Sequence, residues 1–244
     1  MRYNNANSFF REKFGTKIIK ISLDGGFTCP NRDGTLSYGG CIFCSEKGSG
    51  DFAGDRKLDI EKQFEINKVK MSKKWKDGKY IAYFQAFTNT YAPLEYLKEL
   101  FIKASNLPDV VGIFIATRPD CITEEIAKFL YELNKKIYVC IELGFQTSKA
   151  ESIKLINRCY DNIVFENCVK MLNNYNLDII VHTILGLPYE TKNDMLETIK
   201  YVSKFNINGI KLQLLHIIKD TNLHKLYLKN NFKILTLEEY VDIV

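Results

Sequence analysis

Six short segments of the chain are almost continuously apolar and rich in β-branched residues. They cover residues 17–23, 80–86, 110–117, 136–143, 177–185 and 209–218. Strict alternation of apolar and polar residues would indicate strands with one wet face, whereas near-continuous apolar runs are typical of strands covered on both faces. The pattern therefore predicts the strands of a buried parallel sheet.

Stretches with helical periodicity lie between these segments, at residues 58–75, 93–106, 123–136, 162–176 and 191–206. Pro93 suits the first turn of its helix, and Thr123 is the expected N-cap of the next one because acidic residues follow it. Thr191, with Asp194 three residues later, forms a loose capping box. Repeated strand–helix alternation predicts right-handed βαβ units in a barrel or an open parallel sheet. No repeat, low-complexity tract or linker is present, which predicts one domain over residues 1–244.

Polar or glycine-rich groups follow the end of each predicted strand. They lie in the loop after the first strand, in residues 85–92, 117–120, 142–147 and 182–188, and at His216. The carboxyl ends of parallel strands share one rim, and functional groups of βα barrels gather there. The pattern therefore indicates a functional site at this rim.

The loop after the first strand contains three of the chain's seven cysteines. Cys41 and Cys44 form a C-x-x-C pair, and Cys29 precedes them. A structural zinc site needs four ligands, but the three histidines are distant in sequence, so zinc would require a ligand brought in by the fold. An iron–sulfur cluster on three thiolates fits better, because one iron then stays open to an exogenous ligand. Phe43, next to Cys44, would shield such a cluster.

The other four cysteines, Cys121, Cys140, Cys159 and Cys168, are scattered along the chain. Seven is an odd number, and the spacings fit no secreted disulfide scaffold. We expect these four to be small buried hydrophobic residues.

The overall composition, with 46% hydrophobic and 26% charged residues, is that of an ordinary globular protein. The net charge of +5 permits a polyanionic partner without requiring one. The densest basic run, residues 68–79, is either the solvated end of a helix or a surface that faces RNA. No apolar run reaches the roughly 20 residues that span a bilayer, and the N-terminus lacks a signal-peptide pattern. These features predict a cytoplasmic protein without a membrane partner.

Eight motifs are spread over residues 2–220. They read KISLDGGFTCPNRDGT, YGGCIFC, AYFQAFTNTYAP, TRPDCI, IELGFQT, INR, HTILGLPYET and GIKLQLLHI. Together they resemble the radical S-adenosylmethionine (SAM) superfamily. The long spacing before the C-x-x-C pair resembles its elongator-type subgroup, and within it the chain is similar to the bacterial YhcC/YtqA-type family.

This resemblance implies a partial (β/α)6 TIM-like barrel with a [4Fe–4S] cluster on Cys29, Cys41 and Cys44. These three residues are thus the expected catalytic and metal-binding residues. SAM would chelate the open iron through its amino and carboxylate groups. One electron from the cluster would cleave SAM to methionine and a 5′-deoxyadenosyl radical, which abstracts a hydrogen from the substrate. An electron donor such as flavodoxin or ferredoxin is also implied.

The motif after the second strand is implied to meet the amino group of SAM. Its candidate residues are Gln85, Thr88, Asn89 and Thr90, with Asn89 as the favoured side chain. Backbone oxygens of this stretch would accept the hydrogen bonds of the ammonium group.

The later motifs are implied to hold the rest of SAM. Glu142 and Gln146 would bind the ribose hydroxyls, and Arg158 would bind the carboxylate. Ile184 and Gly186 belong to the stretch that would pack against the adenine. The alternatives are ordinary strand-end hydrogen bonding for Glu142 and Gln146 and a surface ion pair for Arg158.

The substrate implied by the resemblance is the wobble uridine of tRNA, modified on its C5 side chain. A mixture of basic and aromatic residues at 3–17 and 73–80 is compatible with an anticodon loop. Two alternatives stay open: a radical SAM enzyme that acts on a small metabolite, and a non-catalytic iron–sulfur or zinc module. His182 and His216 are either substrate-side groups or structural histidines.

The chain departs from the family pattern in three places, one of which is Phe145, where the family commonly has an aliphatic residue. Cys159 and Tyr160 follow the INR motif, where the family usually has glycine and histidine. Residues 236–244 read as the start of an amphipathic helix at a point where family members continue. The sequence thus leaves open whether a C-terminal extension is missing, and it predicts no oligomeric state.

Overall fold

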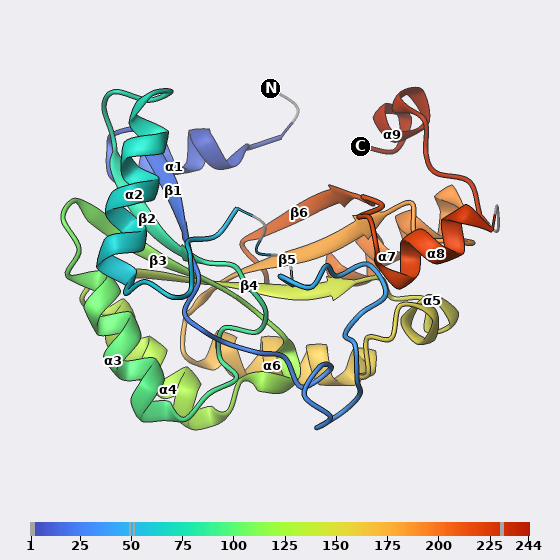
Figure 1. Ribbon diagram of the computed structural model, residues 1–244, viewed down its shortest axis with the longest axis horizontal. Helices are drawn as coiled ribbons and strands as arrows, with labels where there is room; N and C mark the ends of the chain where they lie inside the picture. The colour runs from blue at the N-terminus through green and yellow to red at the C-terminus, as the bar shows by residue number, and fades with distance from the viewer. Residues whose placement is uncertain (1–2, 49, 51, 230–231) are drawn as a thin grey trace.

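A computed structural model describes residues 3–48, 50, 52–229 and 232–244. Its centre is a six-stranded parallel sheet in which each strand pairs with its neighbours in sequence, in the order β1-β2-β3-β4-β5-β6. The strands are β1 Ile18–Leu23, β2 Lys79–Phe84, β3 Val110–Thr117, β4 Tyr138–Gln146, β5 Asp178–Leu185 and β6 Gly209–Leu214. The sheet curls into a half-barrel with helices on its outer side (Figure 1). The predicted partial (β/α)6 barrel is confirmed.

The helices that connect the strands are those expected from the sequence. They are α2 Ile60–Ser72, α3 Leu94–Ser105, α4 Glu124–Asn134, α6 Asn162–Asn174 and α7 Lys192–Val202. Thr123 caps α4 by accepting a hydrogen bond from the backbone N–H of Ile126, and Thr191 and Asp194 form a reciprocal capping box on α7. The remaining helical elements are α1 Ala6–Phe14, η1 Pro119–Cys121, α5 Ala150–Leu155, α8 Asn222–Leu228 and α9 Leu237–Ile243. Of these, only α9 was anticipated by the sequence pattern.

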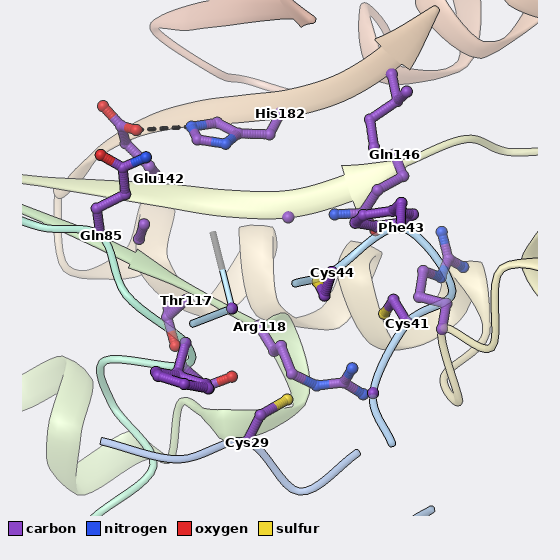
Figure 2. A pocket seen from close by; sticks show the side chains of 18 of the residues that line it. Cys29, Cys41, Phe43, Cys44, Gln85, Thr117, Arg118, Glu142, Gln146 and His182 are labelled. Atoms are coloured by element: carbon purple, nitrogen blue, oxygen red, sulfur yellow. Dashed lines mark hydrogen bonds and ion pairs between the residues drawn. The ribbon is translucent and has the colours of Figure 1, made fainter. Parts of the chain in front are cut away.

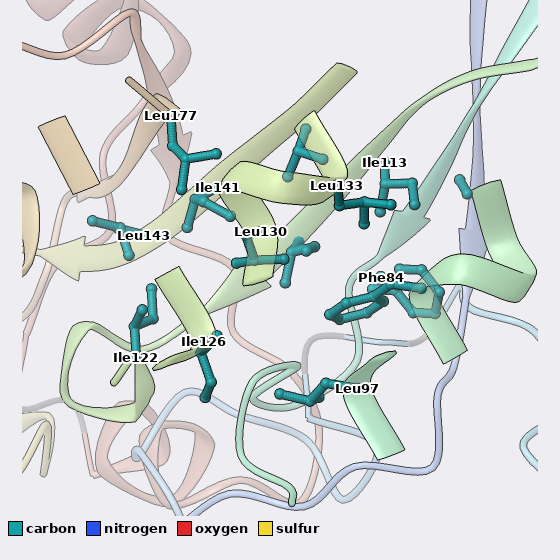
Figure 3. Close-up of a cluster of buried hydrophobic side chains, with 14 of the residues drawn as sticks. Phe84, Leu97, Ile113, Ile122, Ile126, Leu130, Leu133, Ile141, Leu143 and Leu177 are labelled. Atoms are coloured by element: carbon teal, nitrogen blue, oxygen red, sulfur yellow. The ribbon is translucent and has the colours of Figure 1, made fainter. Parts of the chain in front are cut away.

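The main hydrophobic core lies between the outer face of the sheet and the helices (Figure 3). In α4, Leu130 is fully buried, and so is Ile141 of β4. Burying one such side chain contributes about 1.5–3 kcal/mol. This outer core fixes the curvature of the sheet, and with it the direction of every side chain that points inward.

A smaller core occupies the inner, concave face at the amino ends of the strands. Phe10 of α1 is buried there against Phe114 of β3, with ring centroids 5.7 Å apart. Cys140 of β4 is also buried in this cluster. The helix α1 therefore covers the inner face at the amino ends of the strands.

Three strands end differently from the sequence prediction. β2 ends at Phe84, two residues before its predicted end. β4 continues to Gln146, with a register irregularity between Gly144 and Gln146. β6 ends at Leu214, four residues before the predicted end, so the prediction that His216 ends a strand is wrong. None of the described helices is long and apolar enough to cross a bilayer.

Candidate active site

A pocket opens at the carboxyl ends of the strands, and all three cysteines of the loop line it (Figure 2). Seven of the predicted SAM contacts line the same pocket: Phe43, Gln85, Thr88, Glu142, Gln146, Arg158 and Ile184. Asn89, Thr90 and Gly186 do not. The structure thus brings residues from the loop and from the five strands β2 to β6 to one pocket.

The cysteine loop is held by a segment more than 110 residues later in the chain. The side chain of Asn157 donates to the backbone oxygen of Gly40 at 3.0 Å and to the hydroxyl of Ser37 at 3.1 Å. In return, the side chain of Asn31 donates to the backbone oxygen of Asn157. Gly40 has a φ of 82°, a left-handed conformation that glycine adopts without steric cost. The loop therefore owes its path to long-range hydrogen bonds as well as to its glycines.

Within the loop, a turn brings two of the thiols together. The backbone N–H of Cys44 donates to the oxygen of Cys41 at 3.0 Å, and the two thiols share a hydrogen bond. This bond, with burial, raises the pKa of Cys41. It lowers the pKa of Cys44, and the positive charge of Arg32 acts in the same direction. One thiol of the pair is thus favoured as thiolate, the form that binds metal.

Cys29 lies on another side of the pocket, near the guanidinium of Arg118 (Figure 2). Arg118 forms an ion pair with Asp120 at 2.7 Å. No three His, Cys, Asp or Glu side chains of the described chain are close enough to hold a single metal ion. The three thiols instead surround a shared space beside two cationic side chains. This arrangement suits a multi-iron cluster, which takes each thiolate on a different iron.

The loop after β2 divides its residues between the pocket and the protein interior. Thr88 lines the pocket, whereas Asn89 is fully buried and its side-chain amide donates to the oxygen of Ala116 at 2.7 Å. Thr90 is also buried and contacts the hydroxyl of Thr117 at 2.6 Å. The side chains of Asn89 and Thr90 therefore attach this loop to β3 and do not reach the pocket.

Arg158 lines the pocket, but its guanidinium is directed into the protein. It donates to the backbone oxygens of Phe145 at 2.7 Å, Thr147 at 2.8 Å and Tyr160 at 3.0 Å, and to the side chain of Asn162. Burial lowers the pKa of Arg158. With most of its donors used, this side chain holds the end of β4 in place, and the predicted alternative of a surface ion pair is wrong.

The predicted adenine-binding stretch is split in the same way. Ile184 lines the pocket, but Gly186 lines a separate cavity together with His216. A Cβ atom at Gly186 would lie 3.0 Å from the side chain of Leu235. The chain's own C-terminal segment thus covers Gly186, and His216 is exposed outside the pocket.

Glu142 is the centre of a buried charged cluster, which we call the lumen network: Lys20, Tyr83, Glu142, His182 and Lys211. The carboxylate lies 2.8 Å from the ammonium of Lys20, 2.7 Å from the hydroxyl of Tyr83 and 2.6 Å from Nε2 of His182. Although burial opposes it, the hydrogen bond from His182 and the charges of both lysines lower the pKa of Glu142. Both carboxylate oxygens are therefore engaged by protein groups.

The sequence singled out Glu142 and His182 but missed the other members of the lumen network. Lys20, Tyr83 and Lys211 are polar residues within largely apolar strands. The side chain of each one points to the inner face of the sheet. A polar residue at an alternate, inward-facing position of a largely apolar strand is the signal that would have identified them.

The four scattered cysteines are buried as predicted, with one exception. Cys121, Cys140 and Cys168 are buried, and burial raises the pKa of Cys168 to about 12. The prediction of burial is wrong for Cys159, which is exposed, because the chain turns there in a left-handed conformation with a φ of 62°.

Comparison with known proteins gives two family matches. The model of the radical SAM superfamily matches residues 29–202, and that of the radical SAM C-terminal domain matches residues 207–244. The chain is 49% identical to the uncharacterized protein YtqA of Bacillus subtilis over 243 residues, which cover 100% of this chain and 76% of YtqA. It is 34% identical to the protein YhcC of Escherichia coli over 230 residues, covering 93% of this chain and 73% of YhcC.

More distant similarities extend to two named proteins. The fold matches Elp3 of the archaeon Methanocaldococcus infernus with a TM-score of 0.68 at 17% identity, covering 93% of this chain and 52% of the Elp3 chain, so the chain spans about half of that structure. A tRNA-2-methylthio-N(6)-dimethylallyladenosine synthase of Fusobacterium nucleatum is 25% identical over 115 residues, which cover 46% of this chain and 26% of the synthase.

Proposed function

Because the chain belongs to the radical SAM superfamily, we propose that it binds a [4Fe–4S] cluster and SAM in the pocket at the carboxyl ends of its strands. The observation that carries this proposal is the convergence of Cys29, Cys41 and Cys44 on that pocket. When bound and reduced, the cluster supplies the electron that cleaves SAM to methionine and a 5′-deoxyadenosyl radical. The protein's own residues bind, orient and shield these groups.

Two parts of the pocket have defined tasks in this proposal. The three cysteines hold the cluster as thiolates, and the positive charges of Arg32 and Arg118 favour that form. The stretch from Gln85 to Thr88 and the end of β4 at Gln146 present polar groups to SAM. Arg158 acts through the backbone of β4 and is a positioning residue.

We propose further that the substrate is tRNA, modified on the C5 side chain of the wobble uridine, in the cytoplasm. The similarity to a tRNA-modifying synthase and the fold shared with Elp3 support this substrate class. The net charge of +5 is compatible with it. An electron donor such as flavodoxin or ferredoxin completes the proposed system.

The first experiment tests the chemistry. The protein is reconstituted anaerobically with iron and sulfide, reduced with dithionite and supplied with SAM, and 5′-deoxyadenosine is measured. Wild type and Cys168→Ala should form it, because Cys168 lies in α6 outside the pocket. Cys41→Ala should not. A cluster that forms equally well in the Cys41→Ala variant would contradict the assignment of the ligands.

The second experiment tests the substrate. Transfer of deuterium from the labelled C5 side chain of the wobble uridine into 5′-deoxyadenosine would support the proposed reaction. Binding of tRNA should weaken steeply with salt, because lysines and arginines that neutralise phosphates release counterions. Turnover with a small metabolite and no salt-dependent binding of tRNA would refute the proposed substrate.

A further inference from the structure

The pocket carries an excess of positive charge. Within the described part of the chain, Glu142 is the one acidic side chain that lines it, whereas Arg32, Arg118, Arg158 and Lys211 are basic. Arg158 is engaged with backbone oxygens, and Arg118 is paired with Asp120 outside the lining. Arg32 lies at the cysteine loop, where it acts on Cys44. Of these four basic side chains, Lys211 is therefore the one whose charge has no assigned role in the pocket.

In the lumen network, two ammonium groups face one carboxylate. Lys20 forms the closer pair, with its Nζ 2.8 Å from Oε1 of Glu142. Nζ of Lys211 is 3.8 Å from Oε2 of Glu142 and 3.4 Å from the hydroxyl of Tyr83. Burial lowers the pKa of His182, which keeps its imidazole neutral near pH 7. One positive charge thus remains without a close counterion.

The position of Lys211 turns this charge toward the pocket. Its side chain lies on β6, an edge strand of the sheet, and is 38% exposed. Gln213 follows two residues later on the same face of the strand and also lines the pocket. The structure records no hydrogen bond for the side-chain amide of Gln213 within the described residues. The ammonium of Lys211, which has unused donors, and the unpaired amide of Gln213 therefore lie side by side on one wall of the pocket.

This wall is separate from the cysteines. Figure 2 shows Glu142 and His182 on one side of the pocket and the three cysteines on the other. A molecule that occupies the pocket next to the cysteines would have its other end, or a second molecule, against the lumen network. The basic groups near the cysteines and those of the lumen network therefore face different parts of the pocket.

We propose that Lys211 and Gln213 bind an anionic group of the substrate, a carboxylate or a phosphate, and that the lumen network fixes Lys211 for this purpose. The inference rests on the proposed function, since it concerns the molecule that reacts next to SAM. Lys211 donates charge-assisted hydrogen bonds to the anion, and Gln213 donates an amide N–H. Glu142 is held by Lys20, Tyr83 and His182, and it keeps the second ammonium in the lumen in the absence of substrate.

The test uses reconstituted protein and two probes, inorganic phosphate and acetate, in calorimetric titrations at constant ionic strength. At least one probe should bind to wild type. Lys211→Met should weaken its binding by about tenfold or more, the contribution of a hydrogen bond to a charged group. Lys211→Arg should retain most of the binding because it preserves the charge, and it shows that the wall itself is intact. Lys200→Met, in the exposed Lys200–Glu197 pair of α7, should bind as wild type does.

The outcomes separate this inference from the proposed function. The titrations are repeated with SAM present, and the anion should still bind; displacement by SAM would assign the lysine to SAM and overturn the inference. Wild type that cleaves SAM but binds neither probe would overturn the inference alone. Binding that depends on Lys211 in a protein that never cleaves SAM would support the anion site and refute the proposed function.

Discussion

Replacing Glu142 by glutamine removes the one negative charge of the lumen network while preserving the shape of the side chain. The carboxylate is 1% exposed and has three partners within 2.8 Å: Lys20, Tyr83 and His182. Glutamine keeps one acceptor oxygen but cannot balance the lysines. Glu142→Gln should therefore lower the free energy of unfolding.

The size of this loss follows from how deeply each partner is buried. Breaking a fully buried ion pair costs about 3–5 kcal/mol. The side chains of Lys20 and Lys211 are 32% and 38% exposed, so water partly solvates the lysines that lose their counterion. We therefore expect a smaller loss of about 2–3 kcal/mol at pH 7, which corresponds to a decrease in Tm of about 5–10 °C for a chain of this length.

The assay is urea unfolding followed by far-UV circular dichroism, with Glu132→Gln as the matched control. Glu132 pairs with Lys135 on the surface, at 2.7 Å, and is 56% exposed. Removing the charge of such a pair should cost less than about 1 kcal/mol. Equal losses in the two variants, or a Glu142→Gln variant as stable as wild type, would refute the view that the lumen network is a buried ionic cluster.

Three further predictions concern Arg158, Gly186 and His182. Arg158→Met should lower the free energy of unfolding by at least about 3 kcal/mol in protein without SAM, because it leaves buried carbonyl oxygens unpaired; a loss seen only as weaker SAM binding would contradict its positioning role. Gly186→Ala should lower Tm, since a left-handed φ of 85° costs about 1–2 kcal/mol with a side chain, and the loss should shrink in a Leu235→Ala background if contact with Leu235 contributes. His182→Gln should flatten the pH dependence of stability: burial holds the folded-state pKa of His182 below 6.5, so its contribution is present above that pH and is lost as pH falls. If Tm of the His182→Gln variant falls between pH 7 and pH 5 as steeply as that of wild type, this prediction is contradicted.

The strands could be predicted because each one is covered on both faces, which leaves a continuous apolar run in the sequence. Helix α1 could not, because its apolar residues close the half-barrel from the inner side and belong to no strand–helix repeat. The burial of Phe10 depends on its contact with Phe114, which is distant in the sequence. Elements that repeat a local pattern were therefore predictable, and elements that fill space left by others were not.

The residues of the site likewise divide into those that a local sequence pattern predicts and those that only the fold brings into place. Cys41 and Cys44 are neighbours through local spacing, so the sequence identified them. Thr88 and Asn89 are adjacent, but one lines the pocket and the other is buried in the opposite direction. The left-handed conformation of Phe87, with a φ of 61°, precedes this change of direction, and a non-glycine residue gives no sign of it in the sequence. The role of Lys211 depends on the register of strands far apart in the chain.

The hydrogen bonds between the cysteine loop and Asn157 also have a consequence for the order of events during biosynthesis. The three cysteines leave the ribosome early, but the side chain of Asn31 and the backbone oxygen of Gly40 lack Asn157 as a partner until the chain has been made beyond that residue. Each strand, by contrast, pairs with a sequence neighbour and is able to join the sheet as it emerges. The nascent protein therefore carries its three thiols in a loop that lacks these long-range hydrogen bonds while the first strands already pair, and the loop gains the bonds only after the fourth strand and α5 have been added.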